Sequence, residues 1–328
     1  MNILITGATG FLGSKIVEHF VLQEPDAHII ATGRKFSSDN KISNPRVTYR
    51  LGDLANQSFV ATLFDQEIDV VINCASLSSL WGKAEAYHKA NVVTQENLIN
   101  QSLKSNVSRF VYISTPSIYY NSKDSLNIKE SDTPPSNKIN HYARTKFEAE
   151  QILKMSGLNY IILRPRALVG KGDTVIMPRL MRAYEENKLK IVGSGENVVN
   201  LTSISNMVEA VRLCLHSLHL NEDYNITNGE PVKLWEAINT ILELVKKPPV
   251  TQKVPYWFAY AVASILEFKA KILRSSEEPT LTKYSVGILT KSSTFDITKA
   301  REQLGYKVKQ SSYEALEEFA DWYFDKGK

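Results

Sequence analysis

The sequence of 328 residues predicts an α/β fold: a Rossmann-type, doubly wound parallel sheet with a smaller, mostly helical C-terminal portion for the substrate. Three observations support this fold. Apolar runs typical of strands buried on both faces alternate with helix-like stretches through the first half of the chain. A glycine-rich turn joins the first of these runs to the first helix-like stretch. After Pro165 the regular alternation stops, and the tail from Gly229 is rich in helix-like sequence.

The predicted elements follow from this alternation. The strands expected in the sheet are Asn2–Thr6, His28–Thr32, Val47–Leu51, Asp69–Cys74, Arg109–Ser114 and Asn159–Leu163. The helices expected between and after them are Gly10–Leu22, Tyr87–Ser105, Tyr142–Met155, Pro178–Lys188 and Asn206–His216, with a further strand at Tyr224–Thr227. We therefore predict that residues 1–165 and 199–229 form the nucleotide-binding domain, and that 166–198 and 230–328 form the substrate-binding portion.

Composition excludes several classes of protein. Apolar residues make up 43% and charged residues 23%, which is ordinary for a globular protein and excludes collagen-like, disordered and coiled-coil chains. The net charge of +4 is too small to indicate a nucleic-acid partner. Neither Cys74 nor Cys214 lies in a C-x-x-C pair, so we expect no metal site and no disulfide framework. These features, and an N-terminus without a signal-peptide pattern, predict a cytoplasmic protein.

The most apolar stretch is YWFAYAVASIL, residues 256–266. It is shorter than the roughly 20 apolar residues that a membrane-spanning helix needs, so we expect no spanning segment. Two interpretations stay open. The stretch is either a buried or lid helix, or an amphipathic segment that touches a greasy substrate or makes peripheral contact with a membrane surface.

The turn TGATGFLG, residues 6–13, is typical of dinucleotide binding because it lies between a strand and a helix. Its glycines tighten the turn, let a pyrophosphate approach the backbone and bring the helix close to the sheet. No Gly-Lys-Ser/Thr follows, which excludes a P-loop. The residues expected to hold the cofactor here are Gly7, Thr9, Gly10, Phe11, Leu12 and Gly13.

The second predicted strand is followed by Gly33 and Arg34, where an NAD site would place an acidic residue for the ribose hydroxyl. A guanidinium there suits a 2′-phosphate, so the sequence favours NADP(H), with NAD(H) as the alternative. Arg34 could instead be a solvated loop residue or stack on adenine.

Two further strand ends contribute candidate cofactor contacts. Asp53 and Leu54 follow the third predicted strand, where a carboxylate could accept from the adenine amino group. Ala75 follows the fourth predicted strand, where small residues let the cofactor lie against the sheet edge. We expect Cys74, beside it, to be a small buried apolar residue, not a nucleophile.

Tyr142 and Lys146 lie four residues apart on a predicted helix, so both can reach one reaction centre. A free tyrosine has a pKa near ~10, and a nearby ammonium is expected to lower the pKa of the phenol. The fifth predicted strand ends in three hydroxyl candidates that could hold a substrate oxygen: Ser114, Thr115 and Ser117.

With these motifs the chain resembles the extended short-chain dehydrogenases/reductases, especially their 3β-hydroxysteroid dehydrogenase-like and β-keto acid reductase branch. The resemblance spans nearly the whole chain. It rests on TGATGFLG (6–13), GDL (52–54), NCAS (73–76), Asn91, STPSIYY (114–120), YARTK (142–146), LRPRALVGKGDT (163–174), NLTSISNMVEAV (200–211), YNITNGEP (224–231), LTKYSVGIL (281–289) and FDITKAREQLGY (295–306).

The resemblance implies roles for residues of this chain. The family's catalytic hydroxyl lies four residues before the tyrosine that aligns with Tyr119, which is Thr115 here, with Ser114 preceding it. Asn91 matches a helix asparagine that either supports the backbone or relays a proton. The stretch from Pro165 to Leu168 matches the one whose backbone meets the nicotinamide. A homodimer is expected.

The function expected from the motifs and the resemblance is oxidoreduction of a small molecule. An NAD(P)-dependent enzyme would move a hydride between nicotinamide and a secondary alcohol or ketone of a hydrophobic, acyl or sterol-like substrate. The alternative is a sugar-nucleotide epimerase or dehydratase that holds NAD tightly. Pro116 and Ser117 stand where family dehydratases carry acidic residues, which argues against dehydration. A third interpretation, a silent NADP sensor, is disfavoured because Thr115, Tyr142 and Lys146 are all present.

Overall fold

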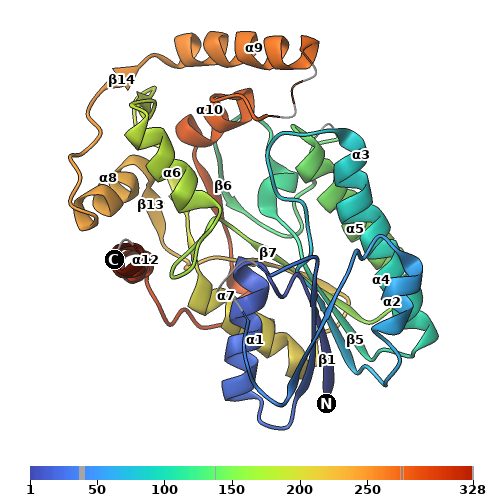
Figure 1. The fold of residues 1–328 in the computed structure, drawn as a ribbon. Coiled ribbons are helices and arrows are strands. Elements are labelled where there is room, and N and C mark those ends of the chain that lie inside the picture. Colours follow the sequence, from blue (N-terminus) through green and yellow to red (C-terminus); the bar gives the residue numbers. More distant parts are fainter. Residues whose placement is uncertain (37–40, 137, 274, 276, 327–328) are drawn as a thin grey trace.

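The computed structural model describes residues 1–36, 41–136, 138–273, 275 and 277–326 (Figure 1). Its centre is a parallel sheet of seven strands in the order β12-β7-β5-β4-β1-β2-β3. These strands are β1 (Asn2–Thr6), β2 (His28–Gly33), β3 (Val47–Leu51), β4 (Val70–Asn73), β5 (Arg109–Ile113), β7 (Tyr160–Pro165) and β12 (Glu222–Ile226). The predicted fold class is confirmed. The strand order reverses between β1 and β4, and such a reversal opens a ligand crevice at the carboxyl ends of the strands.

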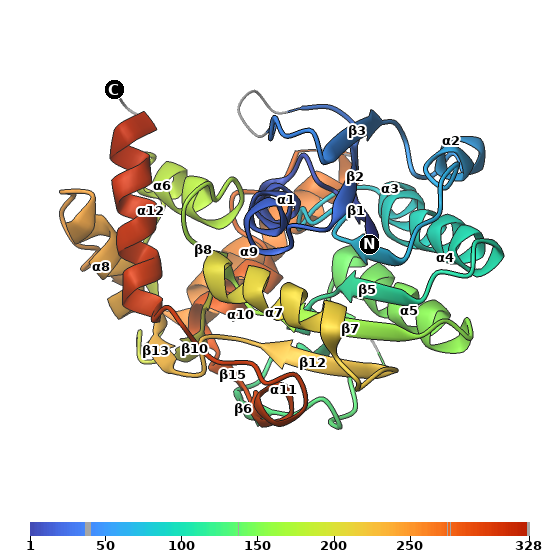
Figure 2. The same ribbon diagram turned by 90° about the horizontal axis from the view of Figure 1, so that it is seen from below.

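Helices cover both faces of the sheet, as Figure 2 shows. Side chains of β1 alternate, so Ile3 and Ile5 join one apolar cluster while Leu4 joins the other. The first cluster includes α1 (Phe11–Gln23) and α7 (Ile204–His216). The second includes residues of α2 (Gln57–Thr62), α4 (Thr94–Lys104) and α5 (His141–Met155). The near-continuous apolar strands are thus explained by burial on both sides.

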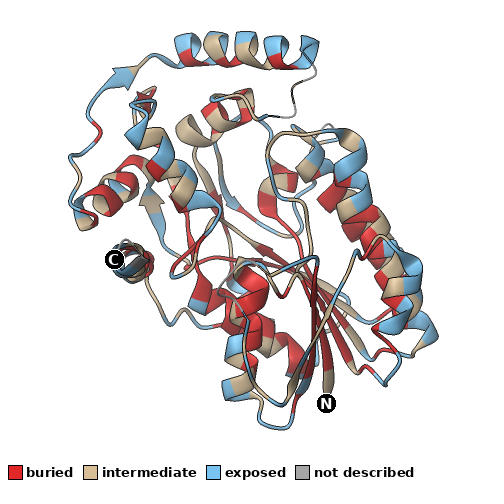
Figure 3. Cartoon of the chain, viewed as in Figure 1, coloured by how far each residue is buried: buried red, intermediate tan, exposed pale blue. Residues whose placement is uncertain are grey.

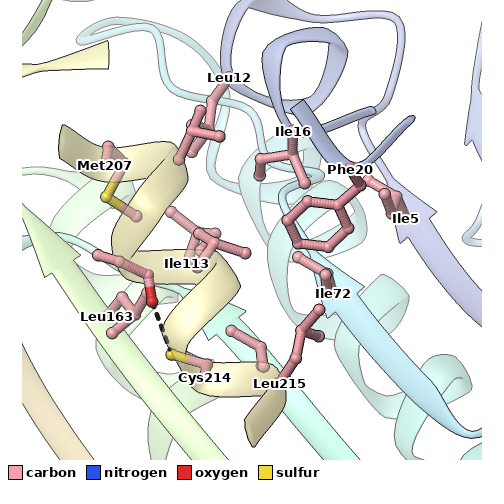
Figure 4. Packing of buried hydrophobic residues seen from close by; sticks show 14 of the residues in the cluster. Ile5, Leu12, Ile16, Phe20, Ile72, Ile113, Leu163, Met207, Cys214 and Leu215 are labelled. Atoms are coloured by element: carbon pink, nitrogen blue, oxygen red, sulfur yellow. Dashed lines mark hydrogen bonds between the residues drawn. The ribbon is translucent and has the colours of Figure 1, made fainter. Parts of the chain in front are cut away.

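The first cluster lies directly below the glycine-rich turn. Figure 4 shows Leu12, Ile16 and Phe20 of α1 facing Met207 and Leu215 of α7. All five side chains are buried, which fixes the start of α1 against the sheet.

Neither cysteine is in a setting that favours a nucleophile. The Cys214 thiol donates to the Ala210 carbonyl oxygen within α7 at 3.2 Å. Burial raises the pKa of the Cys214 thiol, and it raises the pKa of the Cys74 thiol to about 12. Both groups stay protonated at neutral pH and serve packing.

The predicted helix Tyr87–Ser105 is one continuous run with an irregular middle. It consists of α3 (Ala84–Tyr87), a π-helical turn η1 (His88–Val93) and α4. Turns of this kind often occur at functional sites. Here the turn contains Asn91, which is buried beside the candidate site.

Part of the chain forms a second, smaller layer beside the sheet. Four strands pair in the order β13-β10-β15-β6. They are β13 (Pro231–Lys233), β10 (Val198–Asn200), β15 (Ser293–Phe295) and β6 (Ser125–Ile128), so a segment that follows β5 pairs with the C-terminal part of the chain. Two short pairs join β8 (Leu168–Val169) to β11 (Thr202–Ser203) and β9 (Ile191–Val192) to β14 (Lys253–Val254).

The helices of this layer share one apolar cluster that contains Trp235 and Phe319. The cluster joins α6 (Ile176–Glu185), α8 (Leu234–Leu244) and α12 (Ser312–Lys326). Further helices are α10 (Lys283–Thr290), α11 (Thr298–Gln303) and the short helix η2 (Pro116–Tyr119). Helix α6 begins two residues before the predicted Pro178 and ends three before Lys188. The start differs because proline is well tolerated in the first turn of a helix, so Pro178 need not be its first residue.

Helix α9 (Tyr256–Ile272) lies on α10, away from the main sheet (Figures 1 and 3). It is longer than the apolar stretch 256–266 that predicted it. Its buried residues are Ala259, Ala263 and Ala270, while large apolar side chains point outward. The exposed ones are Tyr256, Trp257, Phe258, Tyr260, Ile265, Phe268 and Ile272. Within the described residues, no helix has both the length and the apolar character needed to cross a membrane.

Candidate active site

The glycine-rich turn closes between β1, β4 and α1. Gly7 has a φ of 63°, which favours glycine, and a Cβ there would lie 2.9 Å from the Ala75 nitrogen. A Cβ on Gly13 would lie 2.2 Å from the Gly7 oxygen, so only glycine lets α1 pack this closely. Gly10 is the N-cap of α1 and supplies no side-chain cap to its first N–H groups. The turn therefore fits a pyrophosphate at a helix N-terminus.

The end of β2 brings Thr9 and Arg34 to the same crevice. A Cβ on Gly33 would lie 2.3 Å from the Thr9 hydroxyl, which shows how tightly Thr9 packs over the strand. Arg34 follows directly and is exposed. Its charge helps lower the pKa of the Asp53 carboxyl, although the main cause is a hydrogen bond with Lys89. Lys89 Nζ lies 2.9 Å from Asp53 Oδ2.

Leu54 and Ala75 occupy different settings. The Leu54 side chain is buried in the second apolar cluster, and its carbonyl oxygen accepts from Asn97 Nδ2 at 3.0 Å. Leu54 therefore has little left to offer a cofactor except backbone. The Ala75 N–H donates hydrogen bonds to Asn73 Oδ1 at 3.1 Å and to Thr6 Oγ1 at 3.2 Å. These bonds hold the end of β4 beside the glycine turn.

Phe11 and the stretch from Pro165 to Leu168 border the same crevice. The Phe11 ring lies 3.8 Å from where a Cβ on Gly172 would be. Pro165 ends β7, and Leu168 begins β8. Between them Ala167 has a φ of 46°, an unusual conformation for a residue with a side chain. Backbone of this kind is concentrated at ligand-binding sites.

Tyr142, in the first turn of α5, is brought to the end of β5 by the Asn140 cap of the helix. Its side chain is hydrogen-bonded to Thr115. Burial raises the pKa of the Tyr142 phenol to about 12, and the Thr115 hydrogen bond opposes that rise. The expectation that a neighbouring ammonium lowers this pKa is therefore wrong for this structure, because burial dominates.

Lys146 lies one turn further along α5 and is 1% exposed. Its Nζ donates to the Ile113 carbonyl oxygen at 2.5 Å and lies 4.0 Å from the centre of the Tyr112 ring. Burial lowers the pKa of Lys146 to about 7, against an opposing attraction from Glu150. The ammonium is thus already hydrogen-bonded to backbone and loses much of its charge at neutral pH.

The three candidate hydroxyls have different partners. Thr115 Oγ1 accepts from the Ser117 nitrogen at 3.2 Å and donates to Ser117 Oγ at 3.1 Å. Ser117 Oγ in turn lies 2.9 Å from the Tyr284 hydroxyl. The Ser114 hydroxyl is buried and has no hydrogen-bond partner among the described residues. The structure thus brings Thr115 to Tyr142 and connects it, through Ser117, to a residue of α10.

Asn91 has both ends of its amide occupied. Its Oδ1 accepts from the Leu77 nitrogen at 2.7 Å, and its Nδ2 donates to Thr145 Oγ1 at 2.9 Å. Asn91 therefore ties the loop after β4 to α5. These contacts favour backbone support over a proton relay.

A buried ion pair holds α5 against β7. Arg164 Nε and NH2 donate to the two oxygens of Glu150 at 3.0 and 2.7 Å, and Asp223 Oδ2 lies 2.5 Å from NH2. Both Arg164 and Glu150 are nearly unexposed, and Glu150 lies two turns from Tyr142 on the same helix. This pairing fixes the helix that carries Tyr142 and Lys146.

Sequence reasoning missed Tyr284 and Arg166. Tyr284 lies in α10 and meets Ser117 across 167 residues of chain. Arg166 follows β7. Burial lowers the pKa of its guanidinium, and the nearby Tyr284 only partly offsets this effect. Arg166 was visible only as part of the LRPRALVG run, and no sequence spacing links Tyr284 to the site.

Comparisons with known proteins agree with this site. The model of the NAD dependent epimerase/dehydratase family matches residues 3–227. A 2-alkyl-3-oxoalkanoate reductase of Shewanella oneidensis is 32% identical over 95% of this chain and 84% of its own length. A sterol-4-alpha-carboxylate 3-dehydrogenase of Mus musculus is 26% identical over 95% of this chain and 88% of its own.

Solved structures agree on the fold. The UDP-glucose 4-epimerase of Thermotoga maritima with UDP-glucose has a TM-score of 0.79 at 20% identity, with both chains covered fully. The UDP-glucuronic acid 4-epimerase of Bacillus cereus in complex with NAD has a TM-score of 0.78 at 22% identity, again with both chains covered fully. The resemblance seen in the sequence motifs is confirmed: the chain is an enzyme that belongs to the NAD dependent epimerase/dehydratase family, the extended short-chain dehydrogenases/reductases.

Proposed function

We propose that this enzyme transfers a hydride between NADP(H) and a secondary alcohol or ketone of a hydrophobic substrate. The observation that carries the proposal is the placement of the Tyr142 phenol beside Thr115, next to a glycine turn shaped for a dinucleotide. Residues 1–165 and 199–229 would bind the cofactor, and 166–198 and 230–328 would bind the substrate. The reductase and dehydrogenase names of the relatives support this reaction.

The chain's own residues supply the proton and the orientation. When bound, a reduced nicotinamide supplies a hydride to the carbonyl carbon. Thr115 holds the substrate oxygen, and Tyr142 gives that oxygen its proton as the C=O π pair becomes the new O–H bond. A phenol whose pKa is about 12 keeps its proton at neutral pH and is ready to donate it. Lys146 binds the nicotinamide ribose. Ser114 is the second candidate, after Thr115, for the hydroxyl that holds the substrate oxygen.

The preference for NADP rests on Arg34. Its exposed guanidinium follows β2 at the position where a 2′-phosphate would lie, and no acidic residue replaces it. The other residues proposed to contact the cofactor are Gly7, Thr9, Gly10, Phe11, Leu12, Gly13, Asp53, Leu54, Ala75, Pro165 and Leu168. Leu54 and Ala75 would contribute through backbone or close packing only.

Helix α9 supports a hydrophobic substrate that comes from a membrane surface. Its outward apolar face includes Trp257 at 70% and Phe268 at 67% exposure, with Lys269 and Lys271 in its last turn. We propose peripheral contact of this face with anionic lipid. Wild type should sediment with phosphatidylserine vesicles, and Trp257→Ser with Phe268→Ser should not. We also propose that the enzyme is a homodimer, which analytical ultracentrifugation would test. Its proposed location is the cytoplasm.

The deciding experiment measures cofactor and turnover together. Freshly purified enzyme should release exchangeable NADP(H), and it should oxidise a 2-alkyl-3-hydroxyalkanoate with NADP⁺. Tyr142→Phe should lose about 10²–10⁴-fold in rate with nearly unchanged cofactor affinity, because the phenol acts on the substrate oxygen. Tightly held NAD, with no net oxidation, would instead support the epimerase alternative. A Tyr142→Phe variant that keeps half the activity would refute the role of the phenol.

A further inference from the structure

An arginine beside the proposed reaction centre is half-buried, and its side chain has no partner among the described residues. Arg166 Nε is buried and has no hydrogen-bond partner among the described residues, and no described acidic group forms an ion pair with this side chain. Burial lowers the pKa of Arg166. A buried charge without a partner is costly to a folded protein, so a ligand that supplies the missing anion would be bound strongly.

Arg164, two residues earlier on β7, shows what a satisfied arginine looks like in this protein. Its guanidinium contacts Glu150, Asp223 and Tyr119. Arg166 has an equally firm backbone: its N–H donates to Thr202 Oγ1 at 3.1 Å, and its carbonyl oxygen accepts from the same hydroxyl at 2.5 Å. The main chain of Arg166 is therefore fixed by hydrogen bonds, whereas its guanidinium has no hydrogen-bond partner among the described residues.

The pocket around Arg166 is positively charged. Its described lining contains three cationic side chains, Arg166, Lys123 and Lys291, and no acidic one. Ser117, Tyr120 and Tyr284 add hydroxyl groups, and the cavity volume is about 30 Å³. A Cβ on Gly287 would overlap the Tyr120 hydroxyl, so glycine at this position makes room for the aromatic wall.

Hydroxyl groups connect this pocket to the reaction centre. Thr115 lies beside Tyr142 and donates a hydrogen bond to Ser117 Oγ. Ser117 Oγ is in turn hydrogen-bonded to the Tyr284 hydroxyl at 2.9 Å. Tyr284 also lies close enough to both Tyr142 and Arg166 to influence the pKa of each. A substrate whose oxygen lies on Tyr142 would therefore place a neighbouring substituent near the guanidinium.

We propose that Arg166 binds a carboxylate that the substrate carries on the carbon next to the one that exchanges the hydride. This inference rests on the proposed function and makes Arg166 the residue that selects carboxylate-bearing ketones and alcohols over neutral ones. A guanidinium is suited to this role because its planar fork pairs with both oxygens of a carboxylate. The esters and simple ketones of the same chain length would leave it unpaired.

The test compares a 2-alkyl-3-hydroxyalkanoate with its methyl ester, each oxidised with NADP⁺ and with NAD⁺. Wild type should prefer the acid over the ester by about 100-fold in kcat/KM, and Arg166→Met should reduce this ratio to near one. Arg166→Lys should fall between them because it keeps the charge and loses the fork. Lys104→Met, which removes an exposed charge of α4, is the matched control and should keep the wild-type ratio.

A binding measurement separates this inference from the reaction itself. The acid should raise the melting temperature of wild type and leave that of Arg166→Met unchanged, and the ester should raise neither. Arg166→Met alone should melt no lower than wild type, because it removes a half-buried charge that has no partner among the described residues. Oxidation of acid and ester at equal kcat/KM would overturn the role of Arg166 and leave the proposed function standing. No oxidation of either compound would overturn the proposed function, and the melting shifts would then decide the carboxylate site alone.

Discussion

Replacing Lys146 by methionine should change how stability depends on pH. The pKa of Lys146 is about 7 in the folded protein, because the side chain is buried, against 10.5 for an ordinary lysine. Between these two values the unfolded chain binds a proton that the folded chain does not. The free energy of unfolding contributed by this group therefore rises with pH across that interval. Methionine has a similar length and no proton to bind, so its variant lacks this rise.

The magnitude follows from the two pKa values. Over about pH 7.5 to 8.5 the difference in bound protons grows from about 0.8 to nearly one, which gives about 1.2 kcal/mol. Below pH 7 both states are protonated and the full cost of burying the ammonium is present. The variant should therefore be more stable than wild type there, and this advantage should shrink as the pH rises.

Urea unfolding of the cofactor-free protein at several pH values measures this effect. Titrating groups that Lys146 does not influence, including the Cys214 thiol, are present in both proteins and cancel in the difference. Lys104→Met, at an exposed site of α4, is the control and should track wild type. If wild type and Lys146→Met show the same pH slope in this window, Lys146 has no lowered pKa and the account of its burial is refuted.

Three further variants test other contacts. Arg34→Ala should lose about 1.5–3 kcal/mol of NADPH binding energy, which weakens NADPH binding by roughly 10–100-fold, and should leave NADH binding nearly unchanged. Equal losses of affinity for NADPH and NADH in fluorescence titrations would contradict the role of Arg34 at the 2′-phosphate. Thr115→Val should slow turnover by about 10²-fold or more while Ser114→Ala changes it little, and the reverse order in steady-state rates would reassign the hydroxyl. Glu150→Leu should lower the free energy of unfolding by about 3 kcal/mol, because it removes one of the two carboxylates that pair with the buried Arg164. A loss under about 1 kcal/mol in urea titrations would show that the pair is dispensable.

The features that the sequence predicts correctly are local or periodic. The glycine turn is readable because its steric demands fall on neighbours within a few residues, such as Gly13 against Gly7. The parallel sheet is readable because strands buried on both faces are apolar along their whole length. Tyr142 and Lys146 share a helix face for the same local reason.

The features that sequence reasoning missed depend on burial or on distant segments. The direction of the Tyr142 pKa shift came out wrong because spacing shows the ammonium four residues away and does not show desolvation. Arg164 and Arg166 look alike in the sequence, yet one meets Glu150 and the other meets no described acidic group. The contact between Ser117 and Tyr284 joins residues 167 positions apart, which no local pattern encodes.

The contact between Ser117 and Tyr284 also sets an order of assembly during synthesis. The strands around the glycine turn are all made before residue 74, and the last strand of the main sheet to be made, β12, ends at Ile226. Tyr284 and β15, which pairs with β6, emerge from the ribosome later, and chains tend to fold from the N-terminus as they are made. A nascent chain can thus form its dinucleotide cradle well before it closes the pocket beside the reacting carbon. An arrested ribosome–nascent chain ending near residue 265, whose last part is still inside the ribosome, should bind nicotinamide dinucleotide yet show no turnover.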